Sequence, residues 1–272
     1  MEIAGPLSLI GCGKMGRAML SGWLGRGLAP DRVYLVEPNG EAIAPFLAVG
    51  CHGAEAPPAD SHVVVIAVKP QTISRALEGL GARLGSQTLY LSIVAGVTIA
   101  RLGAQLGRGL GAGAPIVRCM PNTPAAIGRG MTVLAAGADV TQSQRDLAET
   151  LLSAVGETAW IDDEALLDPV TAVSGSGPAY VFFLTETLAK AGVAAGLPAT
   201  LAEQLARATV SGAGELLRRA EEDPAQLRRN VTSPGGTTQA ALEVLMAGEG
   251  LQPLMTAAVA AASRRGRELG KA

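Results

Sequence analysis

The chain has 272 residues, a formal net charge of −2 and a sequence pI near 5.8, so its charge gives no reason to expect nucleic acid or an anionic membrane as a partner. Hydrophobic residues make up 48% and charged residues 17% of the chain, which excludes a disordered protein and suits about two folded domains. No apolar run is long enough to span a membrane, and the first predicted strand starts too early to leave room for a cleaved signal. The three cysteines lack metal-site spacing, so we expect free thiols, a cytoplasmic protein and no metal site.

The first predicted unit, within residues 8–19, is a strand, a glycine-rich turn and a helix. The turn contains Gly11, Gly13 and Gly16 in the pattern GxGxxG. In this pattern the first glycine permits a tight turn, the second lets the backbone approach a pyrophosphate, and the third lets the helix pack on the strand. The amides at the start of the helix would hold the phosphates. The pattern alone is a weak signal, because the chain has 35 glycines.

Further strands are predicted at the apolar runs 32–36, 62–68 and 88–93. Unbroken runs of this kind, separated by helix-length segments, are typical of a parallel sheet buried on both faces. Glu37 ends the second run about 20 residues after the last motif glycine, where dinucleotide-binding units carry the carboxylate that reads the ribose. A carboxylate there accepts the free 2′-hydroxyl of NAD and repels the 2′-phosphate of NADP, so Glu37 favours NAD. A solvated strand end is the alternative interpretation.

Two polar segments follow later strands, at the sheet edge where open α/β sheets bind ligands. After the third strand, Lys69 is expected either to face the cofactor or to bond nearby carbonyls. After a strand at 114–120, two prolines surround Asn122 and Thr123, and this rigid corner either directs both side chains at the cofactor or is only a stiff loop. Strands are also expected at 131–136 and 157–161, with a helix between them that starts at a capping-box sequence, Thr141 to Gln144.

Strand signals stop near residue 162, so we predict a mostly parallel α/β dinucleotide-binding domain at 1–162 and an all-helical domain at 163–272. A helical stretch at 168–192 is interrupted by SGSGPAY, which implies close helix packing, a kink or ligand contact. The helices that follow have apolar stripes but little core of their own. Such helices commonly bury their apolar faces against another subunit, which predicts an obligate dimer.

The late segment 230–238, NVTSPGGTT, precedes a helix predicted from Gln239 to Met246. Glycine-freed amides, hydroxyl groups and a helix N-terminus together are typical of an anion site. The segment has no cation, which suits a small carboxylate better than a polyphosphate. A plain helix cap is the alternative interpretation.

Four sets of motifs, spread over essentially the whole chain, together resemble those of the pyrroline-5-carboxylate reductases: GCGKMG with AVKP, RCMPNTP, SGSGPAY and SPGGTT. The resemblance implies a Rossmann-type N-terminal domain and a helical C-terminal domain that interlocks with a second subunit, often in rings of dimers. It also implies hydride transfer from the nicotinamide C4 to C5 of 1-pyrroline-5-carboxylate, which gives proline in the last step of proline synthesis. A protonated imine is already electrophilic, so the protein's main task would be to place two carbons in contact.

By position, the resemblance implies a cofactor site and a substrate site. The cofactor residues are Gly11, Cys12, Gly13, Lys14, Met15, Gly16, Glu37, Pro38, Asn39, Ala67, Val68, Lys69, Pro70, Ile93, Val94, Ala95 and Asn230. The substrate residues are Ser233, Gly236, Thr237 and Thr238, with Glu164 and Glu221 as acids nearby. Thr238 is the expected catalytic residue, as the hydrogen-bond partner of the ring nitrogen.

The choice between NADH and NADPH does not follow simply from the resemblance. Family members that prefer NADPH often carry serine or a basic residue near the position of Glu37, and asparagine where Ala54 aligns. This chain departs from that pattern at both positions, so we expect NADPH or NADH, with Glu37 favouring NADH.

Two other interpretations stay open: a reductase of another cyclic imino acid or a β-hydroxy acid, and a dinucleotide-sensing or scaffold protein. β-Hydroxyacid dehydrogenases of this architecture use a lysine on the first long helix of the second domain. Lys190 is the only lysine on that helix and sits near its far end, which argues against this activity. A sensing protein would have no need of the SPGGTT segment.

Overall fold

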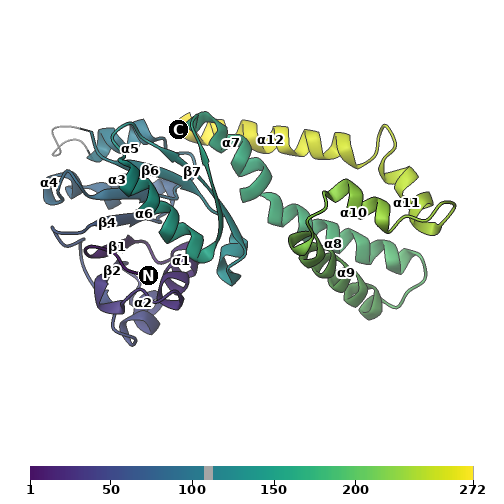
Figure 1. The fold of residues 1–272 in the computed structure, drawn as a ribbon, viewed down its shortest axis with the longest axis horizontal. Coiled ribbons are helices and arrows are strands. Elements are labelled where there is room, and N and C mark those ends of the chain that lie inside the picture. The colour runs from purple at the N-terminus through teal and green to yellow at the C-terminus, as the bar shows by residue number, and fades with distance from the viewer. Residues whose placement is uncertain (107–112, 272) are drawn as a thin grey trace. The chain divides into compact units, whose positions relative to one another are not determined.

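The structure, a computed structural model, describes residues 1–106 and 113–271 (Figure 1). Its strands are β1 (Leu7–Ile10), β2 (Val33–Val36), β3 (His52–Gly53), β4 (Val63–Ile66), β5 (Leu89–Ser92), β6 (Ile116–Met120), β7 (Gly130–Ala136) and β8 (Gly156–Ile161). Its helices are α1 (Lys14–Gly25), α2 (Gly40–Leu47), α3 (Ile73–Leu77), α4 (Leu80–Arg83), α5 (Ile99–Leu106), α6 (Gln142–Leu152), α7 (Leu167–Val170), α8 (Gly177–Ala194), α9 (Ala199–Arg219), α10 (Pro224–Asn230), α11 (Thr237–Leu245) and α12 (Leu251–Lys271).

The described strands form one sheet in the order β3-β2-β1-β4-β5-β6-β7-β8. Neighbouring strands are parallel except for β6 and β7. At the centre, Leu9 of β1 lies between Leu35 of β2 and Val65 of β4. The chain therefore proceeds to one side of β1 and then to the other, and the crevice at such a reversal is where doubly wound sheets bind ligands.

Apolar side chains cover both faces of this sheet. Val63 and Val65 belong to a cluster with α1 and α6, whereas Val64 and Ile66 belong to a second cluster with α3, α4 and α5. Because successive strand residues point to opposite faces, burial on both sides requires an unbroken apolar run. This confirms the predicted parallel α/β sheet. The short strand β3 was not predicted, because two residues carry no periodic signal.

The capping box predicted at the start of α6 is confirmed. Thr141 Oγ1 accepts a hydrogen bond from the Gln144 amide at 3.3 Å, and Gln144 Oε1 accepts one from the Thr141 amide at 3.0 Å. These bonds satisfy two donors that a helix N-terminus would otherwise leave unpaired.

Two compact units make up the chain: Met1–Gly175 together with the chain from Ala262 onward, and Ser176–Ala261. The predicted boundary after residue 162 thus falls inside the first unit. The reason is that Leu167 of α7 is buried against Val133 and Ala135 of β7, so α7 completes the core of the sheet. Strand signals end where the sheet ends, but they do not report a helix that packs on it.

The interruption predicted within the helical stretch 168–192 is a π-helical turn, Thr171–Gly175, between α7 and α8. A Cβ atom at Gly175 would lie 3.4 Å from the Thr171 Cγ2 atom and 4.0 Å from the Met120 Cε atom. The contacts at Gly175 are ordinary, so the interruption at this motif is chiefly a change of helical geometry.

The second unit is helical throughout and leaves large apolar side chains exposed. On α9 the buried residues are the small Ala202 and Ala206, whereas the larger Leu205 and Leu216 are 46% and 57% exposed. The helices pack through small residues, so their leucines remain uncovered within one chain. Among the helices that the structure describes, none has the length and apolarity needed to cross a bilayer.

Candidate active site

The glycine turn between β1 and α1 is shaped by close contacts at two of its three glycines. Gly11 has φ of 93°, and a Cβ atom there would lie 2.7 Å from the Ala67 carbonyl oxygen. A Cβ atom at Gly16 would collide with the Gly11 carbonyl oxygen. At Gly13 a Cβ atom would meet no atom within 4 Å, so the backbone here is open to an approaching group. No described side chain caps α1, and its first amides can therefore bind an anion.

Glu37 is fixed beside this turn by backbone amides. Cys12 N donates to Glu37 Oε2 at 2.7 Å, and Asn39 N donates to Glu37 Oε1 at 3.0 Å. The Asn39 side chain in turn caps α2 by accepting from the Glu41 amide at 3.1 Å. A negative charge is thus held at the end of β2, against the glycine turn, where it can accept hydroxyl donors and repels phosphate.

Cys12 is buried next to Glu37. Burial, and secondarily the charge of Glu37, raise the pKa of the Cys12 thiol to about 11. The thiol is therefore protonated at neutral pH and unsuited to nucleophilic chemistry. Cys51 and Cys119 are also buried, and all three cysteines are free, as the sequence predicted.

The loops after β4 and β5 continue the same edge of the sheet. Ala67 N donates to the Ile10 carbonyl at 2.8 Å, and Ile93 N donates to the Ile66 carbonyl at 3.1 Å. The ends of β1, β4 and β5 therefore lie side by side, and they bring together the cofactor residues predicted in 11–16, 67–70 and 93–95. The Lys69 side chain is exposed, and the Lys69 carbonyl accepts from the Thr72 amide and hydroxyl, each at 3.0 Å.

The rigid corner after β6 binds protein groups through Asn122. Asn122 Oδ1 accepts from the Met131 amide at 2.9 Å, and Asn122 Nδ2 donates to Ser174 Oγ at 3.2 Å. The sequence left open whether this corner directs its side chains at the cofactor or is only a stiff loop. For Asn122 the geometry favours the stiff loop, because its side chain bonds to protein groups. The Thr123 side chain is exposed. The bond to Ser174 also joins two of the motifs, RCMPNTP and SGSGPAY, which sequence reasoning did not connect.

Glu164 connects three segments of the first unit. Its Oε1 atom accepts from Arg118 Nη1 at 2.9 Å and from the Ile99 amide at 2.9 Å. The Arg118 side chain is only 7% exposed, so this ion pair is largely shielded from water. Arg118 was not singled out from the sequence; an arginine within an apolar strand is the signal that could have found it. The other acid named by the resemblance, Glu221, is exposed in the second unit.

The SPGGTT segment in the second unit forms the start of α11. Gly235 has φ of 70°, Gly236 occupies the N-cap position, and Gly236 N donates to the Ser233 carbonyl at 3.0 Å. The helix begins at Thr237, two residues earlier than predicted, because the glycine N-cap already allows the helical turn. Thr237 and Thr238 therefore lie exposed in the first turn of α11, and no described side chain caps it.

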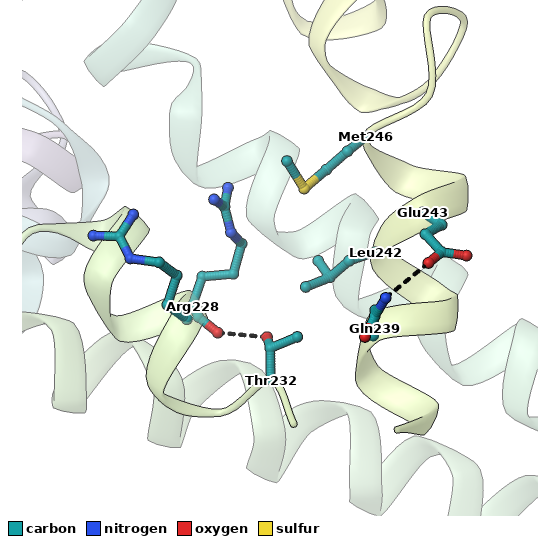
Figure 2. Close-up of a pocket in the computed structure, with 7 residues that line it drawn as sticks. Arg228, Thr232, Gln239, Leu242, Glu243 and Met246 are labelled. Carbon is teal, nitrogen blue, oxygen red and sulfur yellow. Dashed lines mark hydrogen bonds between the residues drawn. The ribbon is translucent and has the colours of Figure 1, made fainter. Parts of the chain in front are cut away.

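A pocket of about 430 Å³ lies between α10 and α11 (Figure 2). It is lined by Arg228, Arg229, Thr232, Gln239, Leu242, Glu243 and Met246. Thr232 Oγ1 donates to the Arg228 carbonyl at 2.6 Å, and Gln239 Nε2 donates to Glu243 Oε1 at 3.1 Å. The predicted substrate residues Ser233, Thr237 and Thr238 are not in its lining. Asn230, named as a cofactor residue, ends α10 and accepts from Gln226 Nε2 at 2.6 Å.

Comparisons with known proteins match both parts of the chain. A family model described as pyrroline-5-carboxylate reductase dimerisation matches residues 164–269, and one described as NADP oxidoreductase, coenzyme F420-dependent, matches residues 6–96. The chain is 41% identical over 268 residues to a pyrroline-5-carboxylate reductase of Pseudomonas aeruginosa, with 97% of this chain and 96% of that protein covered. The chain belongs to the pyrroline-5-carboxylate reductase family.

Solved structures of pyrroline-5-carboxylate reductases have the same fold. The structure of one from Coxiella burnetii matches with a TM-score of 0.91 and 35% identity, over 99% of this chain and 100% of that one. A Plasmodium falciparum pyrroline carboxylate reductase with NADP bound matches with a TM-score of 0.81 and 27% identity, over 98% of each chain. These findings confirm the family resemblance, the fold class and the oxidoreductase class that the motifs predicted.

Proposed function

We propose that the chain reduces 1-pyrroline-5-carboxylate to proline, with hydride supplied by NADH or NADPH. The proposal is supported above all by the 41% sequence identity to a pyrroline-5-carboxylate reductase, which extends over 97% of this chain. The geometry agrees with it on both sides of the reaction. The open backbone at Gly13 suits a pyrophosphate, and the uncapped start of α11 suits a small carboxylate.

The protein contributes position more than acid strength in this proposal. A bound reduced nicotinamide supplies the hydride, and C5 of the protonated imine accepts it. The amides and hydroxyls at the start of α11, with Ser233 and Gly236 before them, bind the substrate carboxylate. The Thr238 hydroxyl accepts a hydrogen bond from the ring N–H and so fixes which face of the imine is presented.

We further propose that NADH is the preferred cofactor. The support is the carboxylate of Glu37, which two amides hold against the glycine turn. In that position it can accept both hydroxyls of an adenosine ribose, whereas a 2′-phosphate would meet a like charge.

We also propose that the chain works in the cytoplasm as a homodimer, or as a ring of dimers. Support for the dimer is the exposed apolar surface of the second unit, where Phe182, Phe183 and Val244 are 68%, 62% and 72% exposed. A single chain in water would not keep so many large apolar groups uncovered. The buried free thiols suit a reducing compartment.

The test is an assay with both cofactors and two substrates. Oxidation of NADH and of NADPH is followed with 1-pyrroline-5-carboxylate and then with pyrroline-2-carboxylate. We expect turnover with 1-pyrroline-5-carboxylate and a higher kcat/KM for NADH. Faster turnover of pyrroline-2-carboxylate would show that the proposed substrate is wrong. No oxidation of NADH or NADPH with either substrate would refute the proposed enzymatic activity.

A Glu37→Ser variant tests the cofactor preference. Removing the like charge should raise the ratio of kcat/KM for NADPH to that for NADH about tenfold or more. Glu41→Ser is the matched control, because Glu41 is an exposed acid on the same segment and should leave the ratio unchanged. An unchanged ratio in Glu37→Ser would refute the role given to Glu37.

A further inference from the structure

The C-terminal end of α12 belongs to the first unit and contacts the loop that follows β5. Gly96 of that loop has φ of 74°. A Cβ atom at Gly96 would lie 3.3 Å from the Gly270 nitrogen, and one at Gly270 would lie 3.2 Å from the Gly96 carbonyl oxygen. The two backbones are therefore close together, and a side chain on either glycine would require its neighbour to shift by a few tenths of an ångström.

The end of α12 is itself held in place. Ser263 of α12 is only 7% exposed, so the helix is already buried at this point. A Cβ atom at Gly266 would lie 3.2 Å from Asp168 Oδ1, so this turn of α12 packs tightly on α7. Gly270 thus belongs to a fixed helix end that can act as a support for the loop it contacts.

The loop between β5 and α5 is fixed at both of its ends as well. At its start, the Val94 amide donates to Ser92 Oγ at 3.3 Å. At its end, the Ile99 amide donates to Glu164 Oε1 at 2.9 Å. Val94 and Val97 are buried, whereas Ala95 is exposed at the sheet edge. Between these two attachments, the left-handed turn at Gly96 lies against Leu269 and Gly270 of α12.

We propose that Gly270 is a positioning residue for the dinucleotide, because its contact with Gly96 holds Ile93–Ala95 in the conformation that binds the cofactor. The inference rests on the proposed function, which places these three residues in the cofactor site. A side chain at position 270 would push the Gly96 carbonyl outward and shift the loop by a few tenths of an ångström or more. The end of α12 then supports the cofactor site, although it lies far along the chain from the residues of that site.

The test compares Gly270→Ala and Gly270→Val with the unchanged protein. NADH binding is measured directly from the fluorescence of the bound dinucleotide, without substrate, and KM for 1-pyrroline-5-carboxylate is measured at saturating NADH. We expect the Kd for NADH to rise severalfold in Gly270→Ala and about tenfold or more in Gly270→Val, with the substrate KM within about twofold. Gly25→Val is the matched control, because a Cβ atom at Gly25, the last residue of α1, would meet no atom within 4 Å.

The thermal midpoint separates positioning from loss of structure. Alanine has a higher helix propensity than glycine, so this substitution does not by itself destabilise the helix. Weaker NADH binding in Gly270→Ala, at an unchanged or higher Tm, would therefore support positioning. Binding as tight as that of the unchanged protein in Gly270→Val, or equal weakening in Gly25→Val, would overturn the inference. Failure of the unchanged protein to bind NADH or NADPH would instead refute the proposed function.

Discussion

At the scale of single residues, the proposed site depends on glycines, which would bind through their backbone and not through a side chain. Gly11 and Gly16 are required by contacts with neighbouring carbonyls, and Gly13 leaves the backbone open. At the start of α11, Gly236 is the N-cap, and no described side chain caps the first amides of the helix. Two helix N-termini thus supply partial positive charge, which suits a pyrophosphate at one and a small carboxylate at the other.

Replacement of Thr238 tests the chemistry at the second of these helices. Thr238→Ala should lower kcat about ten- to a hundredfold, because a hydrogen bond to a charged group is lost. The Kd for NADH should stay unchanged, since the residue is proposed to contact substrate only. Steady-state kinetics and NADH fluorescence measure the two effects. Thr238→Ser keeps the hydroxyl and should recover most of the turnover; turnover in Thr238→Ala equal to that of the unchanged protein would remove the catalytic role.

The Cys12 thiol predicts a pH dependence of stability. Its pKa is 9.0 in an unfolded chain, and in the folded protein burial and the charge of Glu37 raise the pKa to about 11. Between these values the unfolded chain has lost the proton and the folded protein has not, so rising pH favours unfolding. The stability that the protonated Cys12 thiol contributes is fully present below pH 9 and is lost as the pH rises toward 11. We expect Tm to fall less steeply over this range in Cys12→Ser than in the unchanged protein; parallel curves would show that Cys12 does not titrate as described.

At the scale of elements, the Arg118–Glu164 pair joins β6, the start of α5 and the segment before α7. Glu164→Gln should lower the free energy of unfolding by about 2–3 kcal/mol, because it leaves a buried guanidinium without its counter-ion. Denaturant unfolding measures the loss.

The exposed pair between Arg265 and Glu268 is the control for this prediction. Its side chains are 66% and 61% exposed, so Glu268→Gln should cost less than about 1 kcal/mol. Equal effects in the two variants would mean that burial of Arg118 does not determine the strength of the pair.

At the scale of the whole molecule, most of the large apolar side chains that the described chain leaves exposed lie in the second unit. Phe182→Asp places a charge on α8 where the side chain is 68% exposed. If a second copy covers this helix, burial of the charge should shift the protein toward monomer and lower its Tm. Sedimentation at several protein concentrations measures the shift. Val49→Asp, at a 56% exposed position of the first unit, should leave the oligomeric state unchanged. A dimer as stable in Phe182→Asp as in the unchanged protein would exclude α8 from the interface.

Local patterns predicted much of this fold and of its candidate site. The apolar runs, the glycine turn and the capping box at Thr141 each depend on residues within a few positions of one another, and the structure confirms them. The family motifs are also local, and they correctly indicated the family. Backbone geometry and periodic burial leave signals of this kind because they act over short distances along the chain.

Contacts between distant segments were decided only in the folded protein. Glu164 lies 65 residues from Ile99 and 46 from Arg118, and Asn122 lies 52 from Ser174. The Gly96–Gly270 contact and the packing of α7 on β7 likewise join residues that no local pattern relates. Each of these contacts depends on how whole elements pack together, and a residue type that is acceptable in many environments does not by itself specify its partner.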